Sequence, residues 1–177
     1  MKIHQLDARA AIDARDQLAD LLLDAVGHGG ALGFDPGLGR QDAERYWHGV
    51  TAALADGSRI LLAATHEGTL LGTVQLALCQ RPGGGHRAEV KKMMVHTRVR
   101  RRGIGSVLLR AAEAEARERQ RDLLFLDTEA GSGAEQLYHD LGYTRVDAAP
   151  QHAAAAAGAQ PRPSAVYTKS LLMPETA

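Results

Sequence analysis

The sequence predicts an α+β fold in which helices flank a mixed, mostly antiparallel central sheet. Two helical stretches open the chain, three apolar strands separated by short turns follow them, and a strand–helix–strand unit comes next. Such a unit makes its two strands parallel neighbours, because the crossover helix returns the chain to the same end of the sheet. Parallel and antiparallel pairings are therefore expected in one sheet.

The opening helices are predicted from apolar residues at helical spacing. The first covers 10–27 and stops at Gly27-His28-Gly29-Gly30, and the second covers 41–56 and stops at Gly57. Glycine commonly ends a helix, because it adopts the left-handed conformation of the C-terminal cap. The segment 28–37 between the two helices holds too many glycines for regular structure.

Three strands follow, at Arg59–Thr65, Leu70–Cys79 and Arg87–Val95. The first two form a hairpin, and a glycine-rich turn leads into the third. The helix after the third strand is the clearest in the chain, because its apolar and charged residues separate cleanly. Its predicted buried stripe consists of Ile104, Val107, Leu108, Ala111 and Ala112. Its predicted solvent side holds Arg110, Glu113, Arg117 and Glu118.

Short elements complete the fold. Leu123–Asp127 is an apolar strand that ends in a carboxylate, a pattern typical of a strand covered on both faces. Ser132-Gly133-Ala134-Glu135 predicts a capping box that opens a short helix. Strands are predicted at Tyr143–Val146 and 165–172, with an alanine-rich loop over 148–163 between them.

The composition limits the classes of function. The chain of 177 residues fits one domain spanning 1–177, and its formal net charge of zero gives no indication of a nucleic-acid or membrane partner. The basic run 98–102 has no second basic face beside it. Cys79 is the single cysteine, so the chain holds no internal disulfide, and neither a signal peptide nor a membrane span is visible. We therefore expect a cytoplasmic protein.

The strongest functional signal is the segment Val95-His96-Thr97-Arg98-Val99-Arg100-Arg101-Arg102-Gly103-Ile104-Gly105-Ser106. It leads from an apolar strand through a basic turn with two glycines into a helix. The first N–H groups of a helix have no internal partner and lie at the positive end of its dipole, so they bind anions and above all phosphate. Glycine lets the backbone approach a ligand closely, and arginine adds positive charge. The segment therefore predicts a site for a phosphorylated cofactor.

The spacing Arg100-x-x-Gly103-x-Gly105 is similar to the Arg/Gln-x-x-Gly-x-Gly/Ala pyrophosphate loop of the GNAT family of N-acetyltransferases. Leu137-Tyr138-x-x-Leu141-Gly142-Tyr143 resembles a later signature of the same family, and the resemblance covers most of the chain. It implies a sheet with a splayed parallel strand pair. It also implies an acyltransferase that passes acetyl from acetyl-CoA directly to an amine within a ternary complex, with a homodimer as the assembly often seen.

A narrower likeness connects the chain to the tabtoxin-resistance acetyltransferases, which act on an amino acid-like β-lactam toxin. It rests on His28-Gly29-Gly30, Leu78-Cys79-Gln80, Arg87-Ala88-Glu89-Val90 and Leu126-Asp127-Thr128-Glu129-Ala130-Gly131. The acceptor implied is the amine of a small molecule: such a toxin, an amino acid or an antibiotic. Two positions depart from the family, since Thr97 stands where many members have proline and Gly131 where many have asparagine.

The resemblance assigns residues to the cofactor. The backbone of Met94 and Val95 would pair with the pantetheine amides of acetyl-CoA, and one amide near Met94 would stabilise the oxyanion. The pyrophosphate would be held by Arg100, Arg101, Arg102, Gly103, Ile104, Gly105 and Ser106. No metal site is predicted, because the histidines are scattered and the acidic residues lack ligand spacing.

The acceptor pocket of the family implies His28, Gly29 and Phe34 as substrate-binding residues. Tyr46 and Trp47 could also line that pocket, but ordinary core packing explains them as well. The loop 148–163 is expected on the other side of the pocket.

An amine attacks only when neutral, and an alkyl amine with a pKa near ~10 needs a general base at neutral pH. Glu89 and Asp127 are the candidates, because each is a carboxylate in an otherwise apolar strand, where burial requires a partner or a function. A salt bridge to a nearby Arg or Lys would explain either carboxylate without catalysis. Tyr138 is implied by the resemblance as the acid that protonates the departing thiolate, and its alternative is a core aromatic.

Three other functions compete with this one. A dinucleotide oxidoreductase needs a third glycine where Leu108 stands. A non-catalytic acyl-CoA sensor would keep the glycine loop and lose Glu89, Asp127 and Tyr138. A protein or peptide N-acetyltransferase needs an open groove, whereas the two loops flanking the predicted pocket favour a closed one.

Overall fold

The computed structural model describes residues 1–30, 32–146 and 164–172. Seven strands form one sheet in the order β1-β2-β3-β4-β5-β7-β6, and all neighbouring pairs are antiparallel except β4 and β5. The strands are β1 (Lys2–Leu6), β2 (Arg59–His66), β3 (Thr69–Leu78), β4 (Arg87–Val95), β5 (Leu123–Glu129), β6 (Thr144–Val146) and β7 (Ser164–Ser170). The helices are α1 (Ala8–Asp13), α2 (Arg15–Gly27), α3 (Arg40–Ala55), α4 (Ile104–Glu118) and α5 (Ala134–Asp140), with a 3₁₀ turn at Thr97–Val99. This is the predicted α+β fold with one parallel pair.

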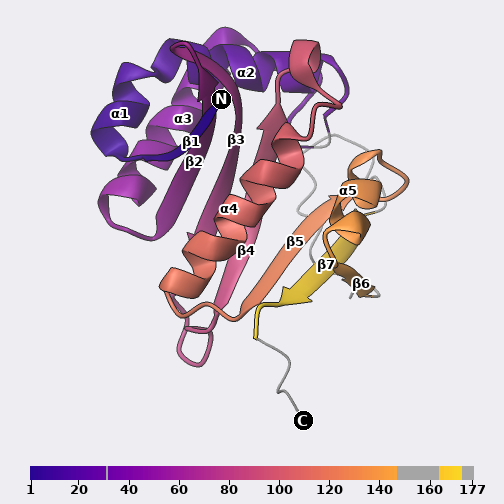
Figure 1. The fold of residues 1–177 in the computed structure, drawn as a ribbon. Helices are drawn as coiled ribbons and strands as arrows, with labels where there is room; N and C mark the ends of the chain where they lie inside the picture. Colours follow the sequence, from indigo (N-terminus) through magenta and orange to yellow (C-terminus); the bar gives the residue numbers. More distant parts are fainter. Residues whose placement is uncertain (31, 147–163, 173–177) are drawn as a thin grey trace.

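Helices cover both faces of the sheet, with α4 on one face and α1, α2 and α3 grouped on the other (Figure 1). Strand β2 shows how this arrangement follows from sequence. Ile60 and Leu62 pack into the core beneath α4, while Leu61 and Ala63 pack into the core beneath α1–α3. Side chains alternate between the faces of a strand, so a strand covered on both sides is apolar at nearly every position.

The parallel contact between β4 and β5 is short. The register joins Arg87 to Leu123, Ala88 to Leu124 and Glu89 to Phe125, and no later pair connects these two strands in the part of the chain that the structure describes. Figure 1 shows the two strands diverging beyond this contact, with α5 past the end of β5. The predicted splayed pair is therefore present.

A β-bulge in β4 lies within the diverging part of the strand. The register with β3 moves from Gln75↔Lys91 to Thr73↔Met94, so β4 has one more residue than its partner between these two pairs. Lys92 sits in the bulge with φ of 47°, a left-handed conformation that is uncommon for a residue other than glycine. The bulge redirects the backbone where β4 leaves β5.

The N-terminal region differs from the sequence prediction in two ways. The strand β1 was not predicted, because only Leu6 of its five residues is buried and its pattern is largely polar. The helix expected over 10–27 is two helices, α1 and α2, which meet at Ala14 with φ −92° and ψ 8°. The side chain of Asp7 caps α1 by accepting from the amide of Ala10.

Further expectations were wrong in α4 and α5. Val107 was placed in the buried stripe of α4 but is 42% exposed, and Glu113 was placed outside it but is 5% exposed. Glu113 is buried because Lys169 of β7 reaches it, with Nζ 2.7 Å from Oε1. No side chain caps α5, whose N-cap is Gly133 rather than Ser132. The loop expected over 148–163 lies outside the described residues.

Candidate active site

A cavity of about 750 Å³ opens where β4 and β5 separate, a volume typical of a small-molecule site. Its walls come from the loop after α2, the edge of β4 from Glu89 to Val95, the turn 100–106, the end of β5 and the helix α5. The divergence of the two parallel strands thus produces the cavity, and segments far apart in sequence meet around it.

The turn into α4 forms the basic end of this cavity. Gly103 is the N-cap of α4 with φ of 77°, a conformation that strains any residue with a Cβ, and no side chain caps the helix. Gly105 packs so tightly that an added Cβ would lie 3.2 Å from Cδ2 of Leu137 on α5. The uncapped N–H groups of the first turn therefore remain available to an anion.

Side chains hold this turn in place. Nε of Arg100 donates to the carbonyl of Val95 over 3.1 Å, which folds the basic segment back onto the end of β4. At the start of the segment, Asp24 of α2 accepts from the amide of Thr97 over 2.8 Å and from its hydroxyl over 2.7 Å. Proline at position 97 would lack both donors, so Thr97 gives this chain a tie between α2 and the glycine turn.

Burial acts to raise the pKa of Asp24, but the hydrogen bonds from Thr97 and the nearby His96 and His28 outweigh it and lower that pKa. Nδ1 of His96 lies 3.5 Å from the Asp24 carboxylate and Nδ1 of His28 lies 3.6 Å from it. Asp24 is therefore ionised at neutral pH and gathers three groups at the corner where α2 meets the turn.

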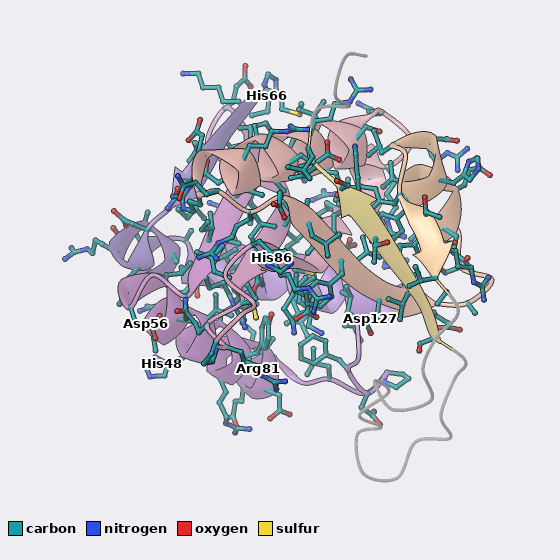
Figure 2. All side chains as sticks on the ribbon, turned by 90° about the horizontal axis from the view of Figure 1, so that it is seen from below. His48, Asp56, His66, Arg81, His86 and Asp127 are labelled. Atoms are coloured by element: carbon teal, nitrogen blue, oxygen red, sulfur yellow. The ribbon has the colours of Figure 1, made fainter. Side chains whose placement is uncertain are left out.

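Two carboxylates line the cavity where the strands part, Glu89 on β4 and Asp127 on β5. Glu89 is half-buried and forms an ion pair with Lys91, whose Nζ lies 3.0 Å from Oε2, so the salt-bridge alternative raised for it is present. Asp127 was expected to be embedded in its strand but is exposed, because β5 has already left β4 at this position. Figure 2 shows Asp127 far from His48 and Asp56, which sit by α3 on the other side of the molecule.

Tyr138 of α5 lines the same cavity and is 6% exposed. Its ring centroid lies 5.9 Å from that of Tyr143 and 5.8 Å from that of Tyr167. Burial and then the negative charge of Asp127 raise the pKa of Tyr138 to about 12. Its hydroxyl is therefore protonated at neutral pH. Tyr138 thus packs as a core aromatic residue and also lines the cavity.

The other predicted site residues divide into two groups. Those that line the cavity are Met94, Val95, Arg100, Arg101, Gly103, Ile104, Gly105, Ser106, His28 and Gly29. Two residues in the described part of the chain, Arg102 and Phe34, are not among those that line it. Phe34 instead packs edge-on against Tyr46, with ring centroids 5.0 Å apart. Neither Tyr46 nor Trp47 is among the residues that line the cavity: the hydroxyl of Tyr46 accepts from buried Gln75, and Trp47 is 3% exposed in the core.

Sequence reasoning missed Lys92, which lines the cavity from the bulge of β4. Its Nζ donates to the carbonyl of Leu32 and lies 5.0 Å from the centroid of the Phe34 ring. A lysine in a strand usually indicates a solvated position, and only the bulge turns this one toward the loop after α2.

The turn between β5 and α5 borders the cavity through Ser132 and Gly133. Gly131, where the family often has asparagine, adopts φ of 81°, and its amide donates to the carboxylate of Glu135. Tyr167 also donates to Glu135, and together with desolvation this raises the pKa of that phenol. The predicted capping box is thus replaced by a contact from Glu135 to Gly131.

Across residues 1–30, 32–146 and 164–172, no three His, Cys, Asp or Glu side chains gather in a way that could hold a metal ion. Figure 2 shows His48, His66 and His86 well apart. None of the helices in these ranges is long and apolar enough to cross a bilayer.

Solved structures of several acetyltransferases resemble this architecture. The ribosomal-protein-alanine N-acetyltransferase of Brucella melitensis superposes with a TM-score of 0.76 at 22% identity, over 96% of this chain and 99% of that chain. The protein yncA of Salmonella typhimurium, solved with its cofactor acetyl-CoA, gives 0.76 at 19% identity over 100% and 97%. An aminoglycoside 6'-N-acetyltransferase complexed with coenzyme A gives 0.72 at 20% identity over 99% and 100%. These likenesses establish a shared fold.

The sequence profile of the acetyltransferase (GNAT) family matches residues 31–143. That match takes in the bulged strand, the glycine turn, α4 and the tyrosine-bearing helix α5. Since it spans well over half of the chain, and since the fold agrees with it, this chain belongs to the GNAT family of acetyltransferases.

Proposed function

We propose that this chain is an acetyl-CoA-dependent N-acetyltransferase that acetylates the amine of a small molecule while both substrates are bound. One observation carries the proposal: a single cavity joins an uncapped helix N-terminus to three proton-handling side chains, Glu89, Asp127 and Tyr138. A binding module needs only the first feature, and an enzyme needs both. Support also comes from structural neighbours whose crystals contain acetyl-CoA or coenzyme A.

The cavity suits acetyl-CoA at two places. The N–H groups from Gly103 to Ser106, with Arg100 and Arg101 beside them, offer a diphosphate both hydrogen bonds and positive charge. The edge of β4 after Glu89 lacks a pairing with β5 among the described residues, so its peptide groups can receive the amides of a pantetheine arm as an added strand would. Acetyl-CoA supplies an acetyl thioester, which an amine can attack.

The side chains at the parting of the strands would handle protons. Glu89 or Asp127 would accept the proton of the acceptor ammonium, directly or through a water molecule, and both carboxylates line the cavity. Tyr138 would hold the proton that the leaving thiolate takes up, and its raised pKa keeps that proton in place at neutral pH. Asp127 influences both groups, because its charge contributes to the raised pKa of Tyr138.

For the acceptor we propose a small amine of the kind that the tabtoxin-resistance likeness suggests: an amino acid, an amino acid-like β-lactam or an amine antibiotic. The glycine-rich loop after α2 lines the cavity through His28 and Gly29 and would bound the acceptor side. Neighbours with protein and aminoglycoside acceptors share the fold, so the fold itself does not select among acceptors.

A thiol-release assay tests the proposal. Purified protein is mixed with acetyl-CoA and, in separate wells, with amino acids, β-lactam amino acids, diamines and aminoglycosides. We expect release of coenzyme A that depends on one class of amine. Calorimetry with acetyl-CoA alone separates the remaining outcomes: binding without amine-dependent release would identify a sensor, and absence of binding would overturn the proposal entirely.

A further inference from the structure

Lys92 is a half-buried cation on the cavity wall that the chemistry described so far does not use. The bulge of β4 presents it to the loop after α2, where Nζ donates to the carbonyl of Leu32 and lies 5.0 Å above the ring of Phe34. An ammonium group has three N–H donors, so contact with one carbonyl leaves donors unused. The Phe34 ring offers a further favourable, non-ionic surface.

Within the described part of the chain, the charge of Lys92 is not balanced by an ion pair, because no carboxylate oxygen lies within 4.0 Å of its Nζ. Desolvation and then the neighbouring charge of Lys91 lower the pKa of Lys92, while Asp127 and Glu89 act in the opposite direction. A half-buried cation without a carboxylate partner is costly unless a ligand supplies one.

The charges that line the cavity lie in different parts of it. Arg100 and Arg101 lie at the glycine turn and Asp140 lies on α5, while Lys91 and Glu89 neutralise each other over 3.0 Å. On the two strands this leaves the carboxylate of Asp127 and the ammonium of Lys92, which are too far apart to bind each other. A molecule that bears an ammonium and a carboxylate would satisfy both at once, and a molecule with positive charges alone would leave Lys92 opposed to it.

We propose that Lys92 binds a carboxylate of the acceptor, so that the acceptor is a zwitterionic amine of the α-amino acid class rather than a diamine or an aminoglycoside. The inference rests on the proposed function and concerns the specificity of the same cavity. Lys92 would determine which acceptors bind, whereas Glu89, Asp127 and Tyr138 would carry out the proton transfers.

The same contacts also give Lys92 a plain structural use, since it ties the loop at Leu32 and Phe34 to β4. A purely structural lysine would affect every acceptor alike when replaced. A carboxylate-binding lysine affects anionic and neutral acceptors differently, so the ratio between them is the informative quantity.

The experiment measures kcat/KM for α-amino acids and for their carboxamides with wild type, Lys92→Met, Lys92→Arg and Lys2→Met. Lys2 lies exposed on the edge strand β1, so Lys2→Met controls for loss of one positive charge outside the cavity. The amines of an amino acid and of its carboxamide differ in pKa, but this difference is the same for every variant. It therefore drops out when the ratio of kcat/KM for the acid to kcat/KM for the amide is compared between variants. Loss of a hydrogen-bonded charge pair corresponds to about a 10- to 100-fold change.

We expect Lys92→Met to lower the ratio of kcat/KM for the acid to kcat/KM for the amide by about 10- to 100-fold and to raise activity toward diamines several-fold. Lys92→Arg and Lys2→Met should keep that ratio within about threefold. An unchanged ratio in Lys92→Met, with amines still acetylated, would overturn the inference and leave the proposed function intact. Binding of acetyl-CoA with no amine acetylated would overturn both.

A second measurement does not depend on folding of the variants. N-acetyl amino acids and N-acetyl amino acid amides have no free amine, and they compete with the acceptor for the wild-type cavity. We expect the anionic compounds to inhibit at lower concentration than the neutral ones, and to lose that advantage at high salt. Equal inhibition by the two series would contradict a carboxylate site at Lys92.

Discussion

Replacement of Gly103 by alanine should separate cofactor binding from fold stability. Gly103 is the N-cap of α4 with φ of 77°, and an ideal Cβ built there meets nothing within 4 Å. The methyl group therefore causes no steric clash within the protein, and the cost of the substitution is backbone strain alone. Holding an L-residue in the left-handed region costs about 1–2 kcal/mol.

This strain predicts the size of two effects, one on Tm and one on the affinity for acetyl-CoA. For a protein of this size, a loss of about 1 kcal/mol lowers Tm by about 2–4 °C, so the fold survives. The acetyl-CoA affinity should fall much more, because alanine relieves its strain by rotating the peptide groups whose N–H bonds face the proposed diphosphate. Each hydrogen bond to a charged group is worth about 1.5–3 kcal/mol, which is about a 10- to 100-fold loss in affinity.

Gly68 provides the matched control. It also has φ of 77° with nothing within 4 Å of an added Cβ, but it lies at the tip of the β2–β3 hairpin, outside the residues that line the cavity. Thermal unfolding should show similar losses for Gly103→Ala and Gly68→Ala, and calorimetry with acetyl-CoA should show weakened binding only for Gly103→Ala. Equal acetyl-CoA affinity in the two variants would refute the assignment of this turn to the diphosphate.

Four further substitutions probe the site. Tyr138→Phe should lower kcat by about 10²- to 10⁴-fold with little change in acetyl-CoA affinity by calorimetry, and wild-type turnover would remove its role as acid. Glu89→Gln and Asp127→Asn should show which carboxylate is the base: the acidic limb of the pH–kcat/KM profile disappears in one variant, and an unaltered profile in both would exclude both residues. Asp24→Asn should lower Tm near pH 7 by about 4–8 °C, because it weakens charge-assisted bonds from Thr97 worth about 2 kcal/mol. Since the folded pKa of Asp24 lies below its ordinary value, that stabilisation is present above about pH 4 and is lost as the pH falls through the folded pKa; a Tm difference that does not shrink as the pH is lowered from about 4 would contradict this.

Much of the fold was predictable because its signals are local. The apolar runs of β2, β3 and β4 and the period of α4 depend on residues close in sequence, and the observed bounds agree with them. Strand β1 carried no such signal, since an edge strand needs only one partner for its hydrogen bonds and buries only Leu6. The break at Ala14 also lacks glycine or proline, so nothing in the local sequence marks it.

Glu113 and Asp127 show what periodicity cannot convey. A glutamate on a helix is expected in solvent, and Glu113 is buried only because Lys169, far along the chain, reaches it. Asp127 was expected to be embedded in its strand, but it is exposed at a point where β5 pairs with β7 and no longer with β4. Both outcomes follow from contacts between distant segments.

The candidate site was predictable where backbone geometry dictates residue type. The glycines of the turn before α4 could be recognised because a left-handed cap and a close helix contact leave little choice. Lys92 could not, because a lysine tolerates many settings and the bulge that redirects it leaves no mark in the local sequence. Phe34, expected in the acceptor pocket, is not among the residues that line the cavity and packs against Tyr46.

The early parting of β4 and β5 has a consequence for how this chain tolerates change. Peptide groups along the exposed edge of β4 are the same in every sequence, so a guest that hydrogen-bonds to them is recognised by chain path rather than by side-chain identity. Residues 90–95 therefore contact such a guest through their backbone, while their side chains answer to other demands: Val90 and Met94 pack in the core, and Lys92 faces the loop after α2. What selection must preserve is the point of divergence itself, at the pairing of Glu89 with Phe125: one more rung between the two strands would seal the opening.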